Sequence, residues 1–215
     1  MAEHSTVNRT VAGSSPAAGA CLWGRSRRRR PHVSHRVTIP ECVEWPAFGV
    51  VSVIAVVPYA SEYREALLSL SLRAWDAVFP LMRRAVPAFV YECFYPEGWQ
   101  QRQADDLAAV LDGEPGNIDV ALEQNGKPVG WVCTRIHPED SMGEVYVVAV
   151  DPKWQGRGVG RRLIEEAQRR SLRQGMRMLM VETGGDPGHA PARAAYEAIG
   201  FQRWPVARYF KELSD

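Results

Sequence analysis

EVYVVAVDPKWQGRGVGRRLIEEA, residues 144–167, reads as an apolar strand, a glycine-rich turn and then an amphipathic helix. The turn contains three glycines, Gly156, Gly158 and Gly160. Because glycine has no side chain, the free N–H groups at the helix start can point at an anion, which the positive end of the helix dipole also favours. Arg157, Arg161 and Arg162 add positive charge at that end. The stretch predicts a phosphate-binding turn, whereas the glycines alone would indicate only a tight connection.

The glycine spacing excludes two familiar nucleotide-binding loops. It lacks the last interval of G-x-G-x-x-G, and no Gly-Lys-Ser/Thr follows. What remains is QGRGVG, residues 155–160, after a strand that ends at Val150 and continues as Asp151-Pro152. This pattern resembles the acetyl-CoA motif of the GNAT superfamily of N-acetyltransferases, Arg/Gln-x-x-Gly-x-Gly/Ala.

A second motif lies near the C-terminal end of the sequence. ARAAYEAIGF, residues 192–201, places Tyr196 on a short helix that ends in Gly200 and Phe201. Gly200 is expected to cap the helix, and Phe201 to return the chain to the core. A lone tyrosine on an alanine-rich helix usually only packs. Together with the first motif, however, this one is similar to the second GNAT signature.

The order of elements also matches the GNAT fold: mixed α/β, with a central, mostly antiparallel sheet flanked by helices on both faces. Strands are expected at 50–57, 118–122, 129–136, 144–150 and 176–181, with a closing strand or strand pair at 201–210. Helices are expected from Ser61 through Trp75, twice between Val86 and Leu111, from the glycine turn to about Arg173, and from Ala192 to Ile199.

Three local patterns refine this expectation. Asn125-Gly126 is a strong hairpin signal between two strands. Met176–Val181 is almost continuously apolar, which suits a strand covered on both faces. The helix after the glycine turn is expected to direct its apolar side chains inward, namely Leu163, Ile164, Ala167 and Leu172.

The resemblance implies acetyl-CoA as co-substrate and assigns residues to it. Backbone groups of Val148–Val150 would pair with the pantetheine arm like an extra strand, and N–H groups from Gly156 to Arg161 would hold the pyrophosphate. GNAT proteins often carry Asn seven residues before the tyrosine, where this chain has His189, which could keep the cofactor contact, act as a base or relay, or cap the helix. The expected cofactor-binding residues are Val148, Ala149, Val150, Gln155, Gly156, Arg157, Gly158, Val159, Gly160, Arg161 and His189.

The resemblance also implies the catalytic residues. Tyr196 matches the general acid that protonates the departing sulfur. Glu144, expected to share a strand face with Tyr146 and Val148, matches a position where family members often place a catalytic carboxylate. An edge charge facing water is an equally good interpretation of Glu144, and Glu182 and Asp186 at the end of the next strand are rival bases.

The expected activity is transfer of an acetyl group to a primary amine by direct transfer in a ternary complex. The alternative is a catalytically weak module of the same fold that binds acyl-CoA as a sensor or as an interaction domain. The acceptor, a small molecule or a peptide amine, would be selected by the first helices and the hairpin. These carry Tyr63, Arg73, Trp75, Tyr91, Trp99 and Trp131, most of which should be core residues.

Composition limits the remaining partners. Four cysteines without a C-x-x-C pair suggest neither zinc nor a disulfide framework, so no metal and a reducing, cytoplasmic setting are expected. The longest apolar run, residues 47–57, is too short for a bilayer span of about 20 residues, so no membrane contact is expected. Homodimerisation stays open.

Residues 1–49 are expected to form a basic, disordered tail before a GNAT-like domain at 50–215. Residues 1–50 contain seven arginines and three acidic residues, and the arginine run at 25–30 lacks the aromatic residues of a nucleic-acid-binding module, so no nucleic acid is expected. AGSSPA, residues 12–17, can be encoded by a sequence resembling a tRNA T-arm. We therefore hypothesise that translation starts near Val50 or Val51.

Overall fold

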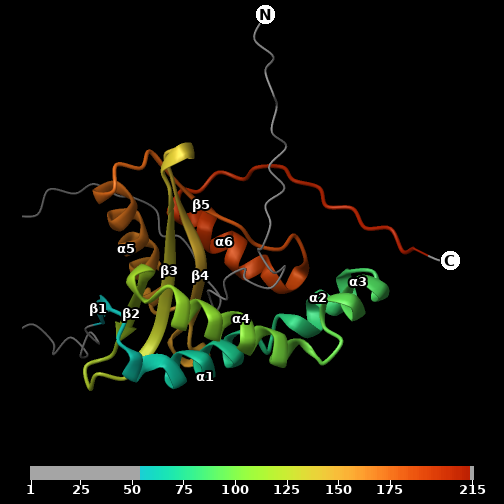
Figure 1. The fold of residues 1–215 in the computed structure, drawn as a ribbon, viewed down its shortest axis with the longest axis horizontal. Helices are drawn as coiled ribbons and strands as arrows, with labels where there is room; N and C mark the ends of the chain where they lie inside the picture. The colour runs from blue at the N-terminus through green and yellow to red at the C-terminus, as the bar shows by residue number, and fades with distance from the viewer. Residues whose placement is uncertain (1–53, 214–215) are drawn as a thin grey trace, which may run out of the picture.

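The computed structural model describes residues 54–213. The predicted tail, its arginine run and the first residues of the predicted first strand lie outside this part. The described residues form one five-stranded sheet in the order β1-β2-β3-β4-β5 (Figure 1). The strands are β1 Ala55–Pro58, β2 Ile118–Leu122, β3 Pro128–His137, β4 Met142–Val150 and β5 Met178–Val181.

The strand directions confirm the predicted mixed, mostly antiparallel sheet. β1 to β4 pair antiparallel in sequence, and β4 pairs with β5 in parallel. The predicted hairpin joins β2 and β3: Gly126 has φ +82°, and its N–H donates to the carbonyl of Glu123 at 2.8 Å. A left-handed φ strains side-chain-bearing residues, which explains the Asn-Gly pair.

Helices cover both faces of the sheet, as the sequence predicts. They are α1 Arg64–Trp75, α2 Phe79–Ala85, α3 Ala88–Phe94, α4 Trp99–Gly113, α5 Val159–Arg173 and α6 Ala190–Ile199. One apolar cluster joins α1–α4 to one face, and a second joins α5 and α6 to the other. α2 was not predicted as a separate helix, because seven residues with a proline at the second position carry too little periodicity.

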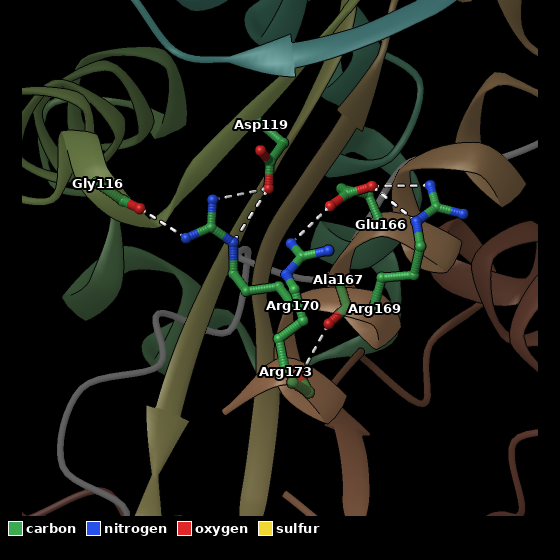
Figure 2. Close-up of polar contacts among 8 residues, drawn as sticks. Gly116, Asp119, Glu166, Ala167, Arg169, Arg170 and Arg173 are labelled. Carbon is green, nitrogen blue, oxygen red and sulfur yellow. Dashed lines mark hydrogen bonds and ion pairs between the residues drawn. The ribbon is translucent and has the colours of Figure 1, made fainter. Parts of the chain in front are cut away.

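α5 is held to the sheet by both apolar and charged contacts. Leu163 is fully buried, but Leu172, predicted to face inward, is 62% exposed. Ser171 takes the inner position instead, where Gly143 of β4 leaves room for it. Figure 2 shows Arg170 reaching from α5 to Asp119 of β2, with nitrogen–oxygen distances of 3.1 and 3.0 Å.

A β-bulge in β4 changes which residues share a face. Cys133 pairs with Val147 and Thr134 with Val145, so Tyr146 is an extra residue of β4 at this shift in register. Tyr146 packs toward the α1–α4 cluster, whereas Val148 packs into the α5–α6 cluster. The expectation that Tyr146 and Val148 share a face is therefore wrong, because the extra residue reverses the alternation.

The predicted closing strand at 201–210 is also wrong. Residues 201–213 form neither a helix nor a strand. Consequently β5 is the last strand of the described sheet, and Met178 is 52% exposed, although a strand covered on both faces was predicted. A strand needs a hydrogen-bonding neighbour, and local alternation cannot specify one.

Candidate functional site

The glycine turn has the backbone geometry that an anion site requires. Gly156 and Gly158 have φ of +74° and +83°, which other residues adopt only with strain. Gly158 is the N-cap of α5, and no side chain forms a capping hydrogen bond there. The N–H of Arg162 already donates to the carbonyl of Gly158 at 3.1 Å, so the open N–H groups belong to the residues just before it.

The arginines around this helix start differ in what they contact. The exposed Arg157 lies over the ring of Trp154, 5.1 Å from its centroid. Arg161 pairs with Glu165 at 2.8 Å. Arg162, counted in the sequence as part of the positive cluster, donates to the carbonyl of Ile54 at 2.8 Å and so ties α5 to the start of β1.

β4 and β5 diverge beside the turn. Their pairing ends at Val145 with Val181, while β4 continues to Val150. The N–H of Asp151 donates to β3 at Val129, so alternation directs the backbone groups of Val148 and Val150 toward the opposite edge. No described strand pairs with that edge beyond Val145. Gln155 occupies one group on it, donating from Nε2 to the carbonyl of Val150 at 3.1 Å.

Glu144 lies near the start of β4 on the α1–α4 face. Its Oε2 is 2.8 Å from Nε2 of His137, at the end of β3, and its side chain is 12% exposed. Beside it Arg135 lies over the ring of Tyr146, 3.2 Å from the centroid. Hydrogen bonds from Arg135 lower the pKa of Glu114 despite its partial burial. Glu144 therefore belongs to a charged cluster on β3 and β4 rather than facing open water.

Sequence reasoning did not single out His137 as a functional residue. His137 precedes Glu144 by seven residues across a short connection, and the two lie on the same face of neighbouring strands. The register of the predicted β3–β4 hairpin was the signal that could have found this pair.

His189 and Asp186 form a buried pair before α6. Nδ1 of His189 is 2.6 Å from Oδ2 of Asp186, and the histidine side chain is 0% exposed. Burial alone would raise the pKa of Asp186, but the hydrogen bond and charge of His189, together with backbone hydrogen bonds such as that from Gly188, leave the pKa lowered. The His189 side chain does not cap α6, and its Nε2 is buried without a hydrogen-bond partner among the described residues.

The two rival bases are engaged elsewhere. Oδ1 of Asp186 accepts the backbone N–H groups of Gly188 and His189 at 2.9 and 3.3 Å, so its carboxylate organises the loop. Glu182 is exposed and pairs with Arg208 at 3.0 Å.

Tyr196 lies on the buried side of α6. It is 4% exposed and packs in the same cluster as Val148 and Val150 of β4. The helix ends as predicted at Gly200, whose φ is +108°, and the N–H of Phe201 donates to the carbonyl of Tyr196 at 3.0 Å. The second motif therefore packs against the C-terminal part of β4, where the pairing with β5 has ended.

The aromatic residues of the first helices and hairpin are mainly core. Trp75 and Trp131 are 0% exposed. Tyr91 and Trp99 line a surface depression together with Pro80, Arg83 and Arg84. The Arg83 guanidinium lies over the Tyr91 ring, 5.3 Å from the centroid. The depression combines aromatic and cationic groups, and sequence reasoning had not selected its arginines.

Two other features are absent from residues 54–213. That range holds no helix long and apolar enough to cross a membrane. It also holds no group of three or more His, Cys, Asp or Glu side chains positioned for a metal ion.

Several curated proteins are similar to this chain. Mycothiol acetyltransferase of Thermomonospora curvata is 38% identical over 93 residues, covering 43% of this chain and 30% of that protein. Mycothiol acetyltransferase of Saccharomonospora viridis is 36% identical over 209 residues, covering 88% and 59%. The chain thus spans about a third to three fifths of the length of these relatives.

Solved structures share the fold. A protein assigned to the GNAT family from Desulfovibrio desulfuricans is 21% identical, with a TM-score of 0.54 over 72% of this chain and 88% of that one. PaiA N-acetyltransferase from Thermoplasma acidophilum, in complex with coenzyme A, is 12% identical, with a TM-score of 0.51 over 72% and 93%. The model of the acetyltransferase (GNAT) family matches residues 76–201, more than half of the sequence, and the chain therefore belongs to this family.

Proposed function

We propose that this protein is an N-acetyltransferase that moves an acetyl group from acetyl-CoA to a primary amine by direct transfer in a ternary complex. The observation that carries the proposal is the uncapped start of α5 beside the open edge of β4. A diphosphate needs N–H donors, and an amide-containing arm needs an unpaired strand edge. Both occur here on consecutive elements.

The residues of this region fit such a co-substrate. Backbone groups of Val148–Val150 would bind the pantetheine arm, with Gln155 next to them. The backbone from Gly156 through Val159 and Gly160 to Arg161 would hold the pyrophosphate, and the exposed Arg157 would add positive charge.

His189 has a narrower role in this proposal than in the sequence analysis. A buried imidazole nitrogen without a partner costs roughly 1–3 kcal/mol. Because Nδ1 is already paired with Asp186, only Nε2 is left to contact a ligand atom, and we assign it to the cofactor.

Glu144 and Tyr196 would supply the acid–base chemistry. The Glu144 carboxylate, with His137 beside it, would accept a proton from the acceptor ammonium, so that the neutral nitrogen can attack the thioester carbonyl carbon. When the carbon–sulfur bond breaks, the Tyr196 hydroxyl would donate its proton to the sulfur. The attacking nitrogen loses its second proton as the amide forms, and this proton would restore the Tyr196 hydroxyl. The proton on Glu144 would pass to solvent, so one proton is released for each acetyl group transferred.

The names of the relatives indicate only the broad chemical class of the acceptor. Those relatives are called mycothiol acetyltransferases, which favours a small-molecule acceptor over a peptide for this chain. The depression formed by Tyr91, Trp99, Arg83 and Arg84 is a candidate for recognising its apolar and anionic parts.

Calorimetry with acetyl-CoA and thiol release across an amine panel test this function. We expect saturable binding and CoA release with at least one amine. Tyr196→Phe should lower kcat about 100-fold while the Kd for acetyl-CoA stays near that of the wild type. Tyr209→Phe, which removes a hydroxyl from a side chain 89% exposed, is the matched control. Binding without release from any amine would favour the sensor alternative, and absence of binding would refute both.

A further inference from the structure

Glu144 has an arginine opposite it on the neighbouring strand, yet its carboxylate pairs with a histidine. The register of β3 and β4 places Arg135 directly across from Glu144. Residues opposite each other in an antiparallel pair have Cβ atoms about 5 Å apart, close enough for an ion pair. Glu144 instead directs Oε2 to Nε2 of His137, at 2.8 Å. The base of the proposed reaction is therefore paired with an imidazole although a guanidinium is within reach.

Two other groups engage the Arg135 guanidinium. It donates from Nε and Nη2 to the carboxylate of Glu114, which follows the end of α4, and it lies over the Tyr146 ring, 3.2 Å from the centroid. The hydrogen bonds from Arg135 lower the pKa of Glu114, although partial burial acts in the opposite direction. Glu114 and Tyr146 thus hold the guanidinium in contacts other than one with Glu144.

The kind of partner decides how well a carboxylate can act as a base. A guanidinium stays charged at neutral pH, so it stabilises the ionised carboxylate and weakens its attraction for a proton. A neutral imidazole donates a hydrogen bond without a full positive charge, so it can orient the carboxylate and leave it basic. Because an ionised carboxylate only accepts hydrogen bonds, Nε2 of His137 carries the hydrogen when Glu144 is ionised.

We propose that His137 and Glu114 are positioning residues for the base: His137 orients the Glu144 carboxylate, and Glu114 keeps Arg135 away from it. The inference rests on the proposed function, in which Glu144 accepts the proton of the acceptor ammonium. With Oε2 held by His137, Oε1 is the oxygen that takes this proton. His137 and Glu114 themselves neither gain nor lose a proton in the step.

The other titratable groups around the pair are consistent with these roles. On the strands and the turn they are the thiol of Cys133, the phenol of Tyr146 and the exposed carboxylates of Glu139 and Asp140. Burial raises the pKa of Cys133 to about 12, so this thiol is uncharged at neutral pH. Met180, opposite Glu144 on β5, does not titrate, and Arg64 and Arg73 of α1 pair with Asp112 and Asp151. Arg135 is therefore the cation that the sheet register brings to Glu144.

The pH dependence of kcat/KM tests both roles, because two substitutions should displace its acid limb in opposite directions. His137→Leu removes the donor, so the limb should move up by about one pH unit and kcat should fall about tenfold. Glu114→Gln releases Arg135 toward Glu144, so the limb should move to lower pH and kcat should fall because the base is weaker. The KM for acetyl-CoA and the circular dichroism should stay unchanged in both variants.

Two matched variants control for loss of structure. His137→Gln retains a side-chain N–H donor and should recover most of the activity that His137→Leu loses. Asp112→Asn breaks another carboxylate–guanidinium pair near the end of α4, that with Arg64 at 2.7 Å, and should leave the pH profile in place. A profile that does not move in His137→Leu, or one that moves to higher pH in Glu114→Gln, would overturn the proposal.

Titration of Glu144 by NMR gives a test that needs no turnover. In protein with ¹³C-labelled glutamate carboxyl groups, the Glu144 signal is assigned by its absence from Glu144→Gln. Its titration should move in the same two directions as the pH profiles, without any acceptor present. Such shifts in a protein that acetylates no amine would support the positioning roles and refute the proposed function. Acetylation together with a titration that neither substitution moves would support the function and refute the positioning roles.

Discussion

Glu144 gains its candidate role from its neighbours. Its carboxylate lies 2.8 Å from His137, while Asp186 is committed to loop hydrogen bonds and Glu182 to Arg208. A base must be close to the amine and have an oxygen not used by structure. Both oxygens of Asp186 are engaged, whereas Glu144 and Glu182 each engage one. Of these two, Glu144 is the less exposed, with 12% of its side chain exposed against 46%.

We expect Glu144→Gln to lower kcat/KM about 100-fold because the amide cannot accept the proton. The Kd for acetyl-CoA, measured by calorimetry, should be unchanged, since Glu144 is not assigned to that ligand. Glu92→Gln on the exposed face of α3 is the control. Retention of full activity in Glu144→Gln would remove Glu144 from the mechanism and leave the base to another group.

The two described cysteines should differ sharply in reactivity. Cys133 is buried on β3, and burial raises its pKa to about 12, whereas Cys93 on α3 is exposed. Only a thiolate reacts readily, and at about pH 8 the Cys133 thiol stays protonated. With Cys21 and Cys42 replaced by serine, Ellman's reagent should titrate one thiol in the native protein and two in denaturant. Rapid titration of both under native conditions would contradict the buried position of Cys133.

The strand, turn and helix from β4 to α5 form the most locally determined element of the fold. Gly156 and Gly158 both adopt left-handed φ values, and Asp151 accepts the N–H of Lys153 at 3.0 Å within the turn. All these groups are close in sequence, so short-range preferences suffice to build the turn. The rest of the fold contributes by leaving the edge of β4 beyond Val145 without a described strand beside the turn.

Gly158→Ala should weaken acetyl-CoA binding about tenfold and destabilise the fold by about 1–2 kcal/mol. The reason is that a Cβ at φ +83° strains the backbone that directs the α5 N–H groups. Calorimetry and urea unfolding give the two values. Gly116→Ala is the matched control, because a Cβ there meets no atom within 4 Å and its φ is not left-handed. An unchanged Kd in Gly158→Ala would show that these N–H groups do not hold the cofactor.

Considered as a whole, the molecule has two apolar layers that share one sheet. Trp131 points into the α1–α4 cluster and donates from Nε1 to Ser71 at 2.8 Å, whereas the neighbouring Val132 points into the α5–α6 cluster. Because adjacent residues of β3 belong to different layers, loss of one layer disrupts the strand that supports the other. We expect the two layers to unfold together.

Trp131→Ala should cost about 3–5 kcal/mol and Leu163→Ala about 2–5 kcal/mol of unfolding free energy, since each leaves a cavity in a different layer. Urea unfolding followed by tryptophan fluorescence and by circular dichroism should give coincident single transitions in both variants. The 41% exposed Leu81 provides a control, because Leu81→Ala should cost well under 1 kcal/mol. Separate transitions in either variant would show that the layers fold independently.

The amino-acid sequence was sufficient to predict what depends on neighbours along the chain. The hairpin at Gly126, the turn before α5 and the helix end at Gly200 each follow from one or two glycines that adopt a left-handed φ without strain. Apolar periodicity likewise located β2 at the residues observed. In these cases the interactions that decide the conformation join residues close in sequence, so a local sequence pattern is sufficient to predict it.

Tertiary structure decided what depends on residues far apart. The bulge at Tyr146, the exposure of Leu172 and the pairing of His137 with Glu144 all follow from how strands and helices align, which local patterns do not encode. The same holds for residues 201–213, whose strand-like sequence has no described neighbour to pair with. Backbone hydrogen bonds between strands join residues distant in sequence, so alternation can suggest a strand but only the assembled sheet can place it.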